Sequence, residues 1–290
     1  SHVPVVQTLH NYRFLCPSGV FYRKNKVCEK CLETGRGASV VNRCWKGSFL
    51  SSVLMCRIIN KMYRKAIFQR TINRYIALSE FSQKKFMAEG FNPRTISVKP
   101  SFLENDPGVS PSTGDYALYI GALRDYKGIQ KLVQSWLDER ISYPLKIVGD
   151  GPLRDGLAKK SARAKNIQYL GFKDFNDVIT LIKGARFLIV PSLCYETFGR
   201  VIVEAYACGV PVLVNRIGAL QELVRESETG LLYDADNQKD LVHKVKFFVE
   251  NNEIFEGMKV NARAEYEKKY TLDNNYQNLM SIYNEVLDKK

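Results

Sequence analysis

Two patterns of hydrophobic residues alternate along residues 116–233. Short continuous apolar runs, typical of strands buried on both faces of a sheet, are separated by stretches in which apolar residues recur at helical spacing. We expect strands near 116–120, 145–148, 167–170, 187–190, 210–214 and 230–233, and helices near 127–139, 152–164, 174–184, 199–208 and 218–225. This order predicts a parallel, doubly wound α/β sheet whose ligands bind at the carboxyl ends of its strands.

The first hundred residues show fewer elements. We expect strands near 3–9, 75–78 and 95–99, a long helix over 47–72, and a helix over 79–88 with Ser79 as its N-cap. So few strands are too little for a complete nucleotide-binding half, and we expect roughly a hundred further residues to precede this sequence. Apolar residues at helical spacing predict two more helices near the end, over 241–249 and 276–287.

Composition divides the chain into domains. Residues 100–114 concentrate Pro, Ser, Gly and Asp, which marks a linker. We expect a partial first domain over 1–104, a linker over 105–115, a second domain over 116–268 and a closing segment over 269–290. A chain of 290 residues, of which 45% are hydrophobic, is large enough for two buried cores.

Charge indicates the chemistry of the partners. The chain carries 43 Lys and Arg against 30 Asp and Glu, a formal charge of +13, so we expect an anionic partner such as a phosphorylated donor or an anionic membrane surface. Nucleic acid is not expected as a partner, because no RNA- or DNA-binding motif is present. No apolar run approaches the ~18 residues of a membrane span, and no signal-peptide pattern opens the sequence, which predicts a cytoplasmic protein.

The segment 191–212 holds the most specific candidate chemistry. Glu196 and Glu204 are eight positions apart across a predicted strand-to-helix junction. The backbone amides at the start of that helix favour a phosphate or diphosphate, because they lie at the positive end of the helix dipole. A diphosphate flanked by two hydroxyl-binding carboxylates describes a nucleotide-sugar site.

This segment resembles the signature of the retaining GT-B glycosyltransferases of family 4, whose E-x7-E element matches Glu196 and Glu204. The resemblance implies two facing Rossmann-like domains, the first incomplete here, and a nucleotide diphosphate sugar donor. It implies that Glu196 contacts the donor sugar, that Glu204 binds the ribose, and that the intervening turn holds the diphosphate. The implied residues of that turn are Thr197, Phe198, Gly199, Arg200 and Val201. The family's last helix packs back on the first domain; the other reading of 269–290 is a helix that caps the second domain alone.

Further loops resemble family elements. Gly121–Gly128 resembles a Gly-Arg-Leu…Lys-Gly element whose cations neutralise the donor diphosphate; Lys127 matches, but Ala122 stands at the usual Arg position. Arg124 either replaces that charge or is a solvated surface residue. The remaining matches, each of which can also be an ordinary tight turn, are Gly149 and Gly151 in a Gly-x-Gly-Pro turn and Gly171 and Phe172 in a base-binding loop.

His10 is the candidate catalytic residue of the first part. It follows a predicted strand in a Thr-x-His-Asn setting that resembles the family's active-site histidine. The resemblance implies that His10 faces the donor sugar and stabilises charge at the anomeric centre, together with Glu196. The alternative is a structural histidine at a strand end. No catalytic metal is expected, since Lys127, Arg124 and the helix terminus would neutralise the charge of the donor diphosphate.

The cysteines and one basic helix raise separate questions. The cysteines that share a C-x11-C-x2-C-x12-C spacing are Cys16, Cys28, Cys31 and Cys44. This spacing fits a tetrahedral structural zinc ion, and equally four reduced thiols of a cytosolic protein. Residues 57–74 form an amphipathic basic helix that suits an anionic lipid surface, or a plain solvated basic face.

These observations predict a metal-independent, retaining glycosyltransferase of bacterial surface polysaccharide biosynthesis. It would move a sugar from a nucleotide diphosphate to a glycan or lipid-linked saccharide, in the cytoplasm or on the inner face of the membrane. The alternatives are a catalytically inactive nucleotide-sugar-binding module, for which the Ala122 departure argues, and a GT-B epimerase.

Overall fold

The computed structural model describes residues 3–111 and 114–288, apart from the side chain of Gln69. Residues 112–113 of the predicted linker lie outside this part. The chain forms two compact units. Unit 1 comprises Ser1–Ser101, Cys194–Phe198 and Asp273–Lys290, and unit 2 comprises Phe102–Leu193 and Gly199–Leu272.

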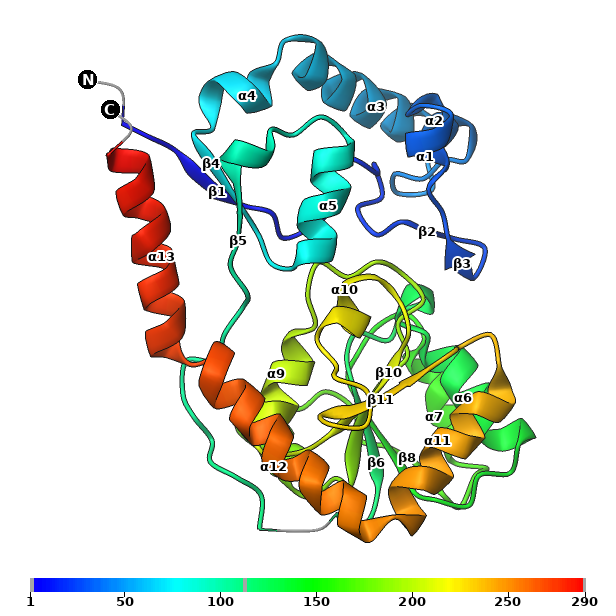
Figure 1. Cartoon of the computed structure of the whole chain (residues 1–290). Helices are drawn as coiled ribbons and strands as arrows, with labels where there is room; N and C mark the ends of the chain where they lie inside the picture. Colours follow the sequence, from blue (N-terminus) through cyan, green and yellow to red (C-terminus); the bar gives the residue numbers. More distant parts are fainter. Residues whose placement is uncertain (1–2, 112–113, 289–290) are drawn as a thin grey trace. The chain divides into compact units, whose positions relative to one another are not determined.

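Unit 2 contains a six-stranded, fully parallel sheet in the order β11-β10-β9-β6-β7-β8 (Figure 1). Its strands are β6 (Ala117–Ile120), β7 (Leu145–Val148), β8 (Ile167–Tyr169), β9 (Phe187–Val190), β10 (Val212–Asn215) and β11 (Gly230–Tyr233). The strands β9 and β10, which both have a neighbour on each side in the sheet, are buried at every position, in keeping with their largely apolar sequences. The order of the strands confirms the doubly wound α/β fold expected for this region.

Helices cover both faces of this sheet. They are α6 (Ile129–Asp138), α7 (Arg154–Ser161), α8 (Phe175–Lys183), α9 (Arg200–Ala207), α10 (Gly218–Glu222), α11 (Gln238–Glu250) and α12 (Asn252–Lys269). On the face covered by α6, α7 and α11, the rings of Phe187 and Phe248 stack with centroids 4.6 Å apart beside the fully buried Trp136. Burial of such large side chains supplies most of the hydrophobic stabilisation of a unit of this size.

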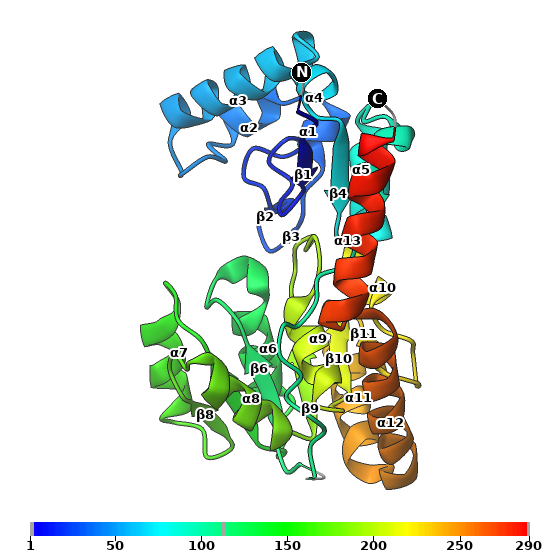
Figure 2. The same ribbon diagram turned by 90° about the vertical axis from the view of Figure 1, so that its left-hand side faces the viewer.

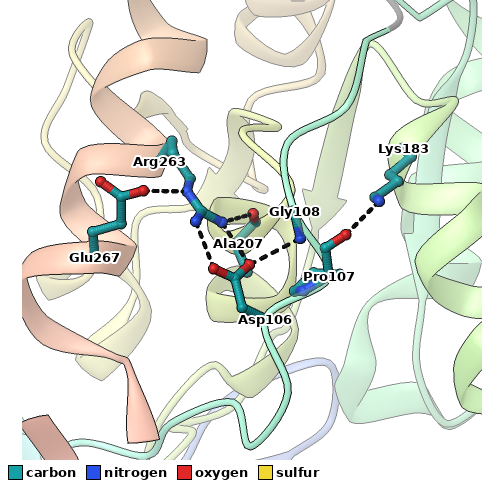
Figure 3. A network of polar contacts seen from close by, with 7 residues as sticks. All are labelled: Asp106, Pro107, Gly108, Lys183, Ala207, Arg263 and Glu267. Carbon is teal, nitrogen blue, oxygen red and sulfur yellow. Dashed lines mark hydrogen bonds and ion pairs between the residues drawn. The ribbon is translucent and has the colours of Figure 1, made fainter. Parts of the chain in front are cut away.

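The segment that opens unit 2 is fastened to its helices (Figure 3). The Arg263 guanidinium donates two hydrogen bonds to the Asp106 carboxylate, at 2.7 and 2.6 Å, and a third to the Ala207 carbonyl at 2.6 Å. Lys183 reaches the Pro107 carbonyl from α8. The hydrogen bonds from Arg263 hold the pKa of Asp106 below its usual value. Hydrogen bonds from the side chains of Lys183 and Arg263 therefore hold this irregular segment against α8, α9 and α12.

Unit 1 contains a three-stranded parallel sheet in the order β1-β4-β5 and a short antiparallel hairpin. The sheet strands are β1 (Val6–Thr8), β4 (Arg74–Ala77) and β5 (Ile96–Val98), and the hairpin strands are β2 (Tyr22–Arg23) and β3 (Lys26–Val27). Its helices are α1 (Lys30–Glu33), α2 (Gly37–Val41), α3 (Phe49–Arg64), α4 (Ile67–Thr71), α5 (Glu80–Ala88) and α13 (Leu272–Leu287), with short 3-10 turns η1 (Pro93–Thr95) here and η2 (Asp125–Lys127) in unit 2. The α5 N-cap is Ser79, as predicted.

The prediction of a single helix over residues 47–72 is wrong. It is two helices, because Ala66 adopts a left-handed conformation (φ +49°) between α3 and α4. The turn places the Phe68 ring 4.4 Å from that of Phe14 and 5.7 Å from that of Phe91. Packing of Phe68 in this aromatic core outweighs continuation of the helix.

No helix within the described ranges has the length and apolar character that crossing a bilayer requires.

Candidate functional site

Three glycine-containing loops follow β6, β7 and β8 and are joined by backbone hydrogen bonds. The Gly121 amide donates to the Val148 carbonyl at 3.1 Å, and the Gly149 amide donates to the Gly171 carbonyl at 2.9 Å. The Tyr169 hydroxyl also donates to the Gly149 carbonyl at 3.1 Å. The glycines predicted to bind the donor thus lie side by side at the carboxyl ends of neighbouring strands, where ligands bind in sheets of this kind.

At two of these positions, the close packing of the loops is enough to explain why the residue is glycine, so a bound ligand is not needed to explain it. Gly149 (φ +146°) and Gly151 (φ +153°) have backbone conformations that favour glycine. A Cβ at position 149 would lie 1.9 Å from the Gly121 carbonyl oxygen, and one at position 151 would lie 2.6 Å from the Leu123 carbonyl oxygen. Gly171 differs, because an added Cβ there meets nothing within 4 Å, and the neighbouring Phe172 is 76% exposed. The loop at Gly171 is therefore open to solvent.

Lys127 lies in the turn η2 before α6. The Leu193 amide donates to the Tyr126 carbonyl at 2.9 Å, which joins this turn to the loop after β9. The side chain of Lys127 is half-buried, whereas those of Ala122 and Arg124 are exposed. The structure thus brings Lys127 to the β9 loop and leaves Arg124 on the surface of its own loop.

Helix α9 carries Glu204 on its second turn. Its N-cap, Gly199, offers no side-chain acceptor, and a Cβ there would lie 2.9 Å from methyl carbons of Ile202 and Leu220. The Glu204 side chain is only 13% exposed, and its Oε1 lies 3.4 Å from Arg200 Nε. Burial raises the pKa of Glu204, although the Arg200 charge opposes that shift. A largely desolvated carboxylate therefore follows a helix start whose first amides have no side-chain cap.

In unit 1, His10 and Glu196 are joined through backbone contacts. The Thr197 hydroxyl donates to the His10 carbonyl at 3.2 Å, and the Tyr12 hydroxyl donates to the Glu196 carbonyl at 3.0 Å. The Ser79 hydroxyl donates to the Thr197 carbonyl, also at 3.0 Å. The two predicted catalytic residues, which are far apart in sequence, therefore share one small cluster.

Tyr195 anchors the same segment by its ring. The ring contacts Phe81 and Phe21, with centroids 4.8 and 5.6 Å apart, and the Lys85 ammonium lies 5.0 Å from its centre. Its hydroxyl hydrogen-bonds Glu29, which also accepts from Lys85 at 2.6 Å. These contacts fix the backbone immediately before Glu196.

Comparison with known proteins identifies the family. Residues 103–265, more than half of the chain, match the family described as glycosyl transferases group 1. The chain belongs to this family. The match spans the glycine loops, Lys127, Glu196 and Glu204, but not His10.

Glycosyltransferases similar to this chain come from archaea and bacteria. An uncharacterized glycosyltransferase of Methanocaldococcus jannaschii, MJ1178, is 32% identical over 60% of this chain and 50% of its own length. The D-rhamnosyltransferase WbpZ of Pseudomonas aeruginosa is 26% identical over 77% of this chain and 63% of its own length. The chain thus spans about half to two thirds of the length of these relatives.

A solved structure supports the fold. HepE of Anabaena, solved in complex with UDP and glucose, has a TM-score of 0.72 over 97% of this chain and 71% of its own, at 21% identity. Together with the parallel sheets, this likeness confirms the Rossmann-like GT-B fold of this group 1 glycosyltransferase chain.

The sequence did not reveal several residues that position the site. Tyr12, Ser79 and Tyr195 act through contacts with residues distant in sequence, which no local pattern encodes. The only available signal was proximity to motif residues: Tyr12 follows His10 by two positions and Tyr195 precedes Glu196. Glu29 offered no signal at all.

The four predicted zinc ligands fall in a segment that holds β2, β3, α1 and α2. The Cys28 amide donates to the Phe21 carbonyl at 2.9 Å across the hairpin, and the Cys44 amide donates to the Ser39 carbonyl at 2.9 Å. Burial, and then the charges of the Cys16, Cys44 and Cys28 thiols, raise the pKa of Cys31 to about 12. In the residues that the structure describes, no three His, Cys, Asp or Glu side chains form a ready-made metal site. Binding of a structural zinc ion by these four cysteines therefore stays a prediction from their spacing in the sequence.

Proposed function

We propose that this chain transfers a sugar from a nucleotide diphosphate to a glycan or lipid-linked saccharide, with retention at the anomeric carbon, in bacterial surface polysaccharide biosynthesis. The observation that carries the proposal is the arrangement in unit 2. There, three joined glycine loops and Lys127 lie at the carboxyl ends of the strands, and Glu204 follows the uncapped start of α9. The complex of HepE with UDP and glucose supports a donor of this class.

The proposed roles follow from charge and hydrogen-bonding capacity. Glu204 accepts hydrogen bonds from the ribose hydroxyls, and the amides of Gly199 to Val201 bind the diphosphate, because helix N-termini attract anions. Lys127 adds a point charge to that anion, and Arg124 is the second cation available on the same loop. In unit 1, Glu196 contacts the hydroxyls of the donor sugar, and His10 stabilises positive charge as it develops at the anomeric carbon.

Transfer would proceed on one face of the sugar. The bond between the anomeric carbon and the diphosphate oxygen breaks while the acceptor hydroxyl oxygen bonds to the same face of that carbon. The acceptor proton passes to the departing diphosphate oxygen. The protein supplies orientation and electrostatic stabilisation rather than a dedicated base. We propose that Lys127 and the α9 amides neutralise the diphosphate without a divalent cation, so activity should persist in a chelator.

We propose a cytoplasmic site of action. Within the described residues, no disulfide joins any of the seven cysteines, as suits a reducing compartment. One observation favours a second candidate function, a nucleotide-sugar-binding module without turnover. Ala122 is exposed where the family pattern has an arginine, so the loop has one fewer cation for the leaving diphosphate.

Calorimetry with uridine, guanosine and adenosine diphosphates tests the proposal. We expect one nucleotide to bind, Glu204→Ala and Lys127→Ala to weaken it at least tenfold, and the exposed control Lys159→Ala to leave it unchanged. Release of the diphosphate from the matching nucleotide sugar, in the presence of an acceptor extract, then separates a transferase from a binding module. Failure of every diphosphate to bind would overturn the proposed donor site.

A further inference from the structure

Unit 1 contains a long basic stretch that the transfer reaction does not explain. Between Glu33 and Glu80 the chain has nine Lys and Arg and no Asp or Glu. The stretch includes α2, α3 and α4, and most of its cations are exposed. Such a one-sided distribution attracts an anionic surface, and the absence of acidic residues leaves the attraction uncompensated within the stretch.

Helix α3 combines this charge with exposed apolar side chains. Its inner face buries Ser52, Cys56 and Ile59. On the opposite face, Leu50, Leu54 and Ile58 recur every four residues and are 77%, 62% and 45% exposed. Residues four apart lie on one side of a helix, so these three form a continuous apolar stripe. A stripe of this kind faces water at a cost unless another apolar phase covers it.

Cations share the face with this stripe. At 100° per residue, Arg57, Lys61 and Arg64 point in the same general direction as Leu50 and Leu54, and all three are exposed. Figure 2 shows α3 along the outer side of unit 1. Val41 of the adjoining α2 is 80% exposed and adds apolar surface nearby.

We propose that the exposed face of α3 docks on a bilayer containing anionic lipids, with Leu50, Leu54 and Ile58 entering the interface and Arg57, Lys61 and Arg64 contacting headgroups. Apolar insertion and electrostatic attraction together are what an interfacial helix needs for stable binding. Nucleic acid fits less well, because a phosphate backbone offers nothing to bury the leucines. Docking goes beyond the transfer reaction and does not depend on it.

Co-sedimentation of the full chain with lipid vesicles tests this inference. We expect binding to vesicles containing phosphatidylglycerol and little binding to phosphatidylcholine alone. Leu50→Asp with Leu54→Asp should weaken binding by roughly a hundredfold, about tenfold for each leucine. Neutralising the three cations with Arg57→Gln, Lys61→Gln and Arg64→Gln should also weaken it about a hundredfold, near fivefold for each charge.

Matched variants separate this site from a general charge effect. Lys159→Gln, Lys239→Gln and Lys246→Gln remove three exposed cations from unit 2, and Val260→Asp replaces an apolar side chain that is 70% exposed on α12. These controls should sediment like the unaltered chain. Circular dichroism should show that the α3 variants remain folded, because every changed side chain is exposed. Equal binding of α3 variants and controls, or binding to an oligonucleotide but to no vesicle, would overturn the proposal.

Discussion

The Thr197 hydroxyl donates a hydrogen bond to the backbone carbonyl of His10 over 3.2 Å. This bond joins a residue of the family signature to the loop that follows β1. Because the bond is made to the backbone, the imidazole of His10 stays exposed and available. The signature segment is thus positioned by unit 1 as well as by its place before α9.

We predict that Tyr12→Phe lowers turnover about tenfold while the fold persists. The change removes the hydroxyl that donates to the Glu196 carbonyl at 3.0 Å, which loosens the position of Glu196. Loss of one such bond should also cost about 1 kcal/mol of unfolding free energy. Tyr22→Phe, which removes a hydroxyl bonded to Asn25 on the hairpin, is the control for activity assays. Equal turnover of the two variants would contradict the positioning role.

Gly149→Ala should destabilise unit 2 by roughly 2–4 kcal/mol, because its Cβ would collide with the Gly121 carbonyl in a backbone conformation that alanine avoids. Gly156→Ala is the matched control. Gly156 lies within α7, where an added Cβ meets nothing within 4 Å, so this change should stabilise by up to about 1 kcal/mol. Urea unfolding measures the stability of both variants, and a Gly149→Ala variant as stable as the Gly156→Ala control would disprove the packing argument.

Glu204 should make the ligand-free protein less stable above the raised pKa of its carboxyl. A group whose pKa is higher in the folded state binds its proton more tightly there, so stability rises as the pH falls through that value toward the ordinary pKa of a glutamate. Glu204→Gln should therefore raise the melting temperature at neutral pH, and the difference should shrink in acid. Thermal melts across a pH series test this, and a difference independent of pH would count against it.

Asp106 should behave in the opposite direction. Its pKa is lowered, chiefly by the hydrogen bonds from Arg263, so the stabilisation is present above the usual aspartate pKa and is lost as the pH falls through the lowered value. Asp106→Asn should cost about 1 kcal/mol or less at neutral pH, since the carboxylate is 46% exposed. Acid titration of stability provides the measurement. Asp155→Asn, at an 82% exposed residue, should change nothing.

Purified protein should contain an equimolar amount of zinc if the cysteine spacing is a metal signature, with the four thiols drawn together around the end of the hairpin. Elemental analysis measures the metal, and Cys28→Ser should abolish it. Cys56→Ser changes a buried cysteine outside the spacing and is the control. A metal-free protein with seven titratable thiols would establish the reduced-thiol reading instead.

Elements with a strong apolar pattern were predictable. The strands Leu145–Val148, Phe187–Val190 and Gly230–Tyr233 begin and end where the sequence placed them, because each is short and largely apolar. Helix α12 was missed. It buries Phe255, Met258 and Ala262 but also the charged Glu265, which dilutes the amphipathic pattern that identifies a helix.

The residues of the candidate site also divide into those that a local sequence pattern predicts and those that only folding brings to the site. Motif residues such as Glu204 and Lys127 are recognisable because residue type and spacing carry their chemistry. The cluster around Thr197 and Tyr195 was beyond local reasoning, since Tyr12, Ser79 and Lys85 reach it only after folding. The break at Ala66 was similarly hidden, because alanine favours helix and the cause is packing of Phe68.

The assignment of Cys194–Phe198 to unit 1 bears on how this protein can be dissected. The polypeptide passes from one unit to the other after Ser101, Leu193, Phe198 and Leu272, so no single cut yields two complete pieces. A fragment covering 102–272 would keep Tyr195 but lose Phe21, Phe81 and Lys85, which contact its ring. The fragment would expose an aromatic side chain to water and leave the backbone before Glu196 unsupported.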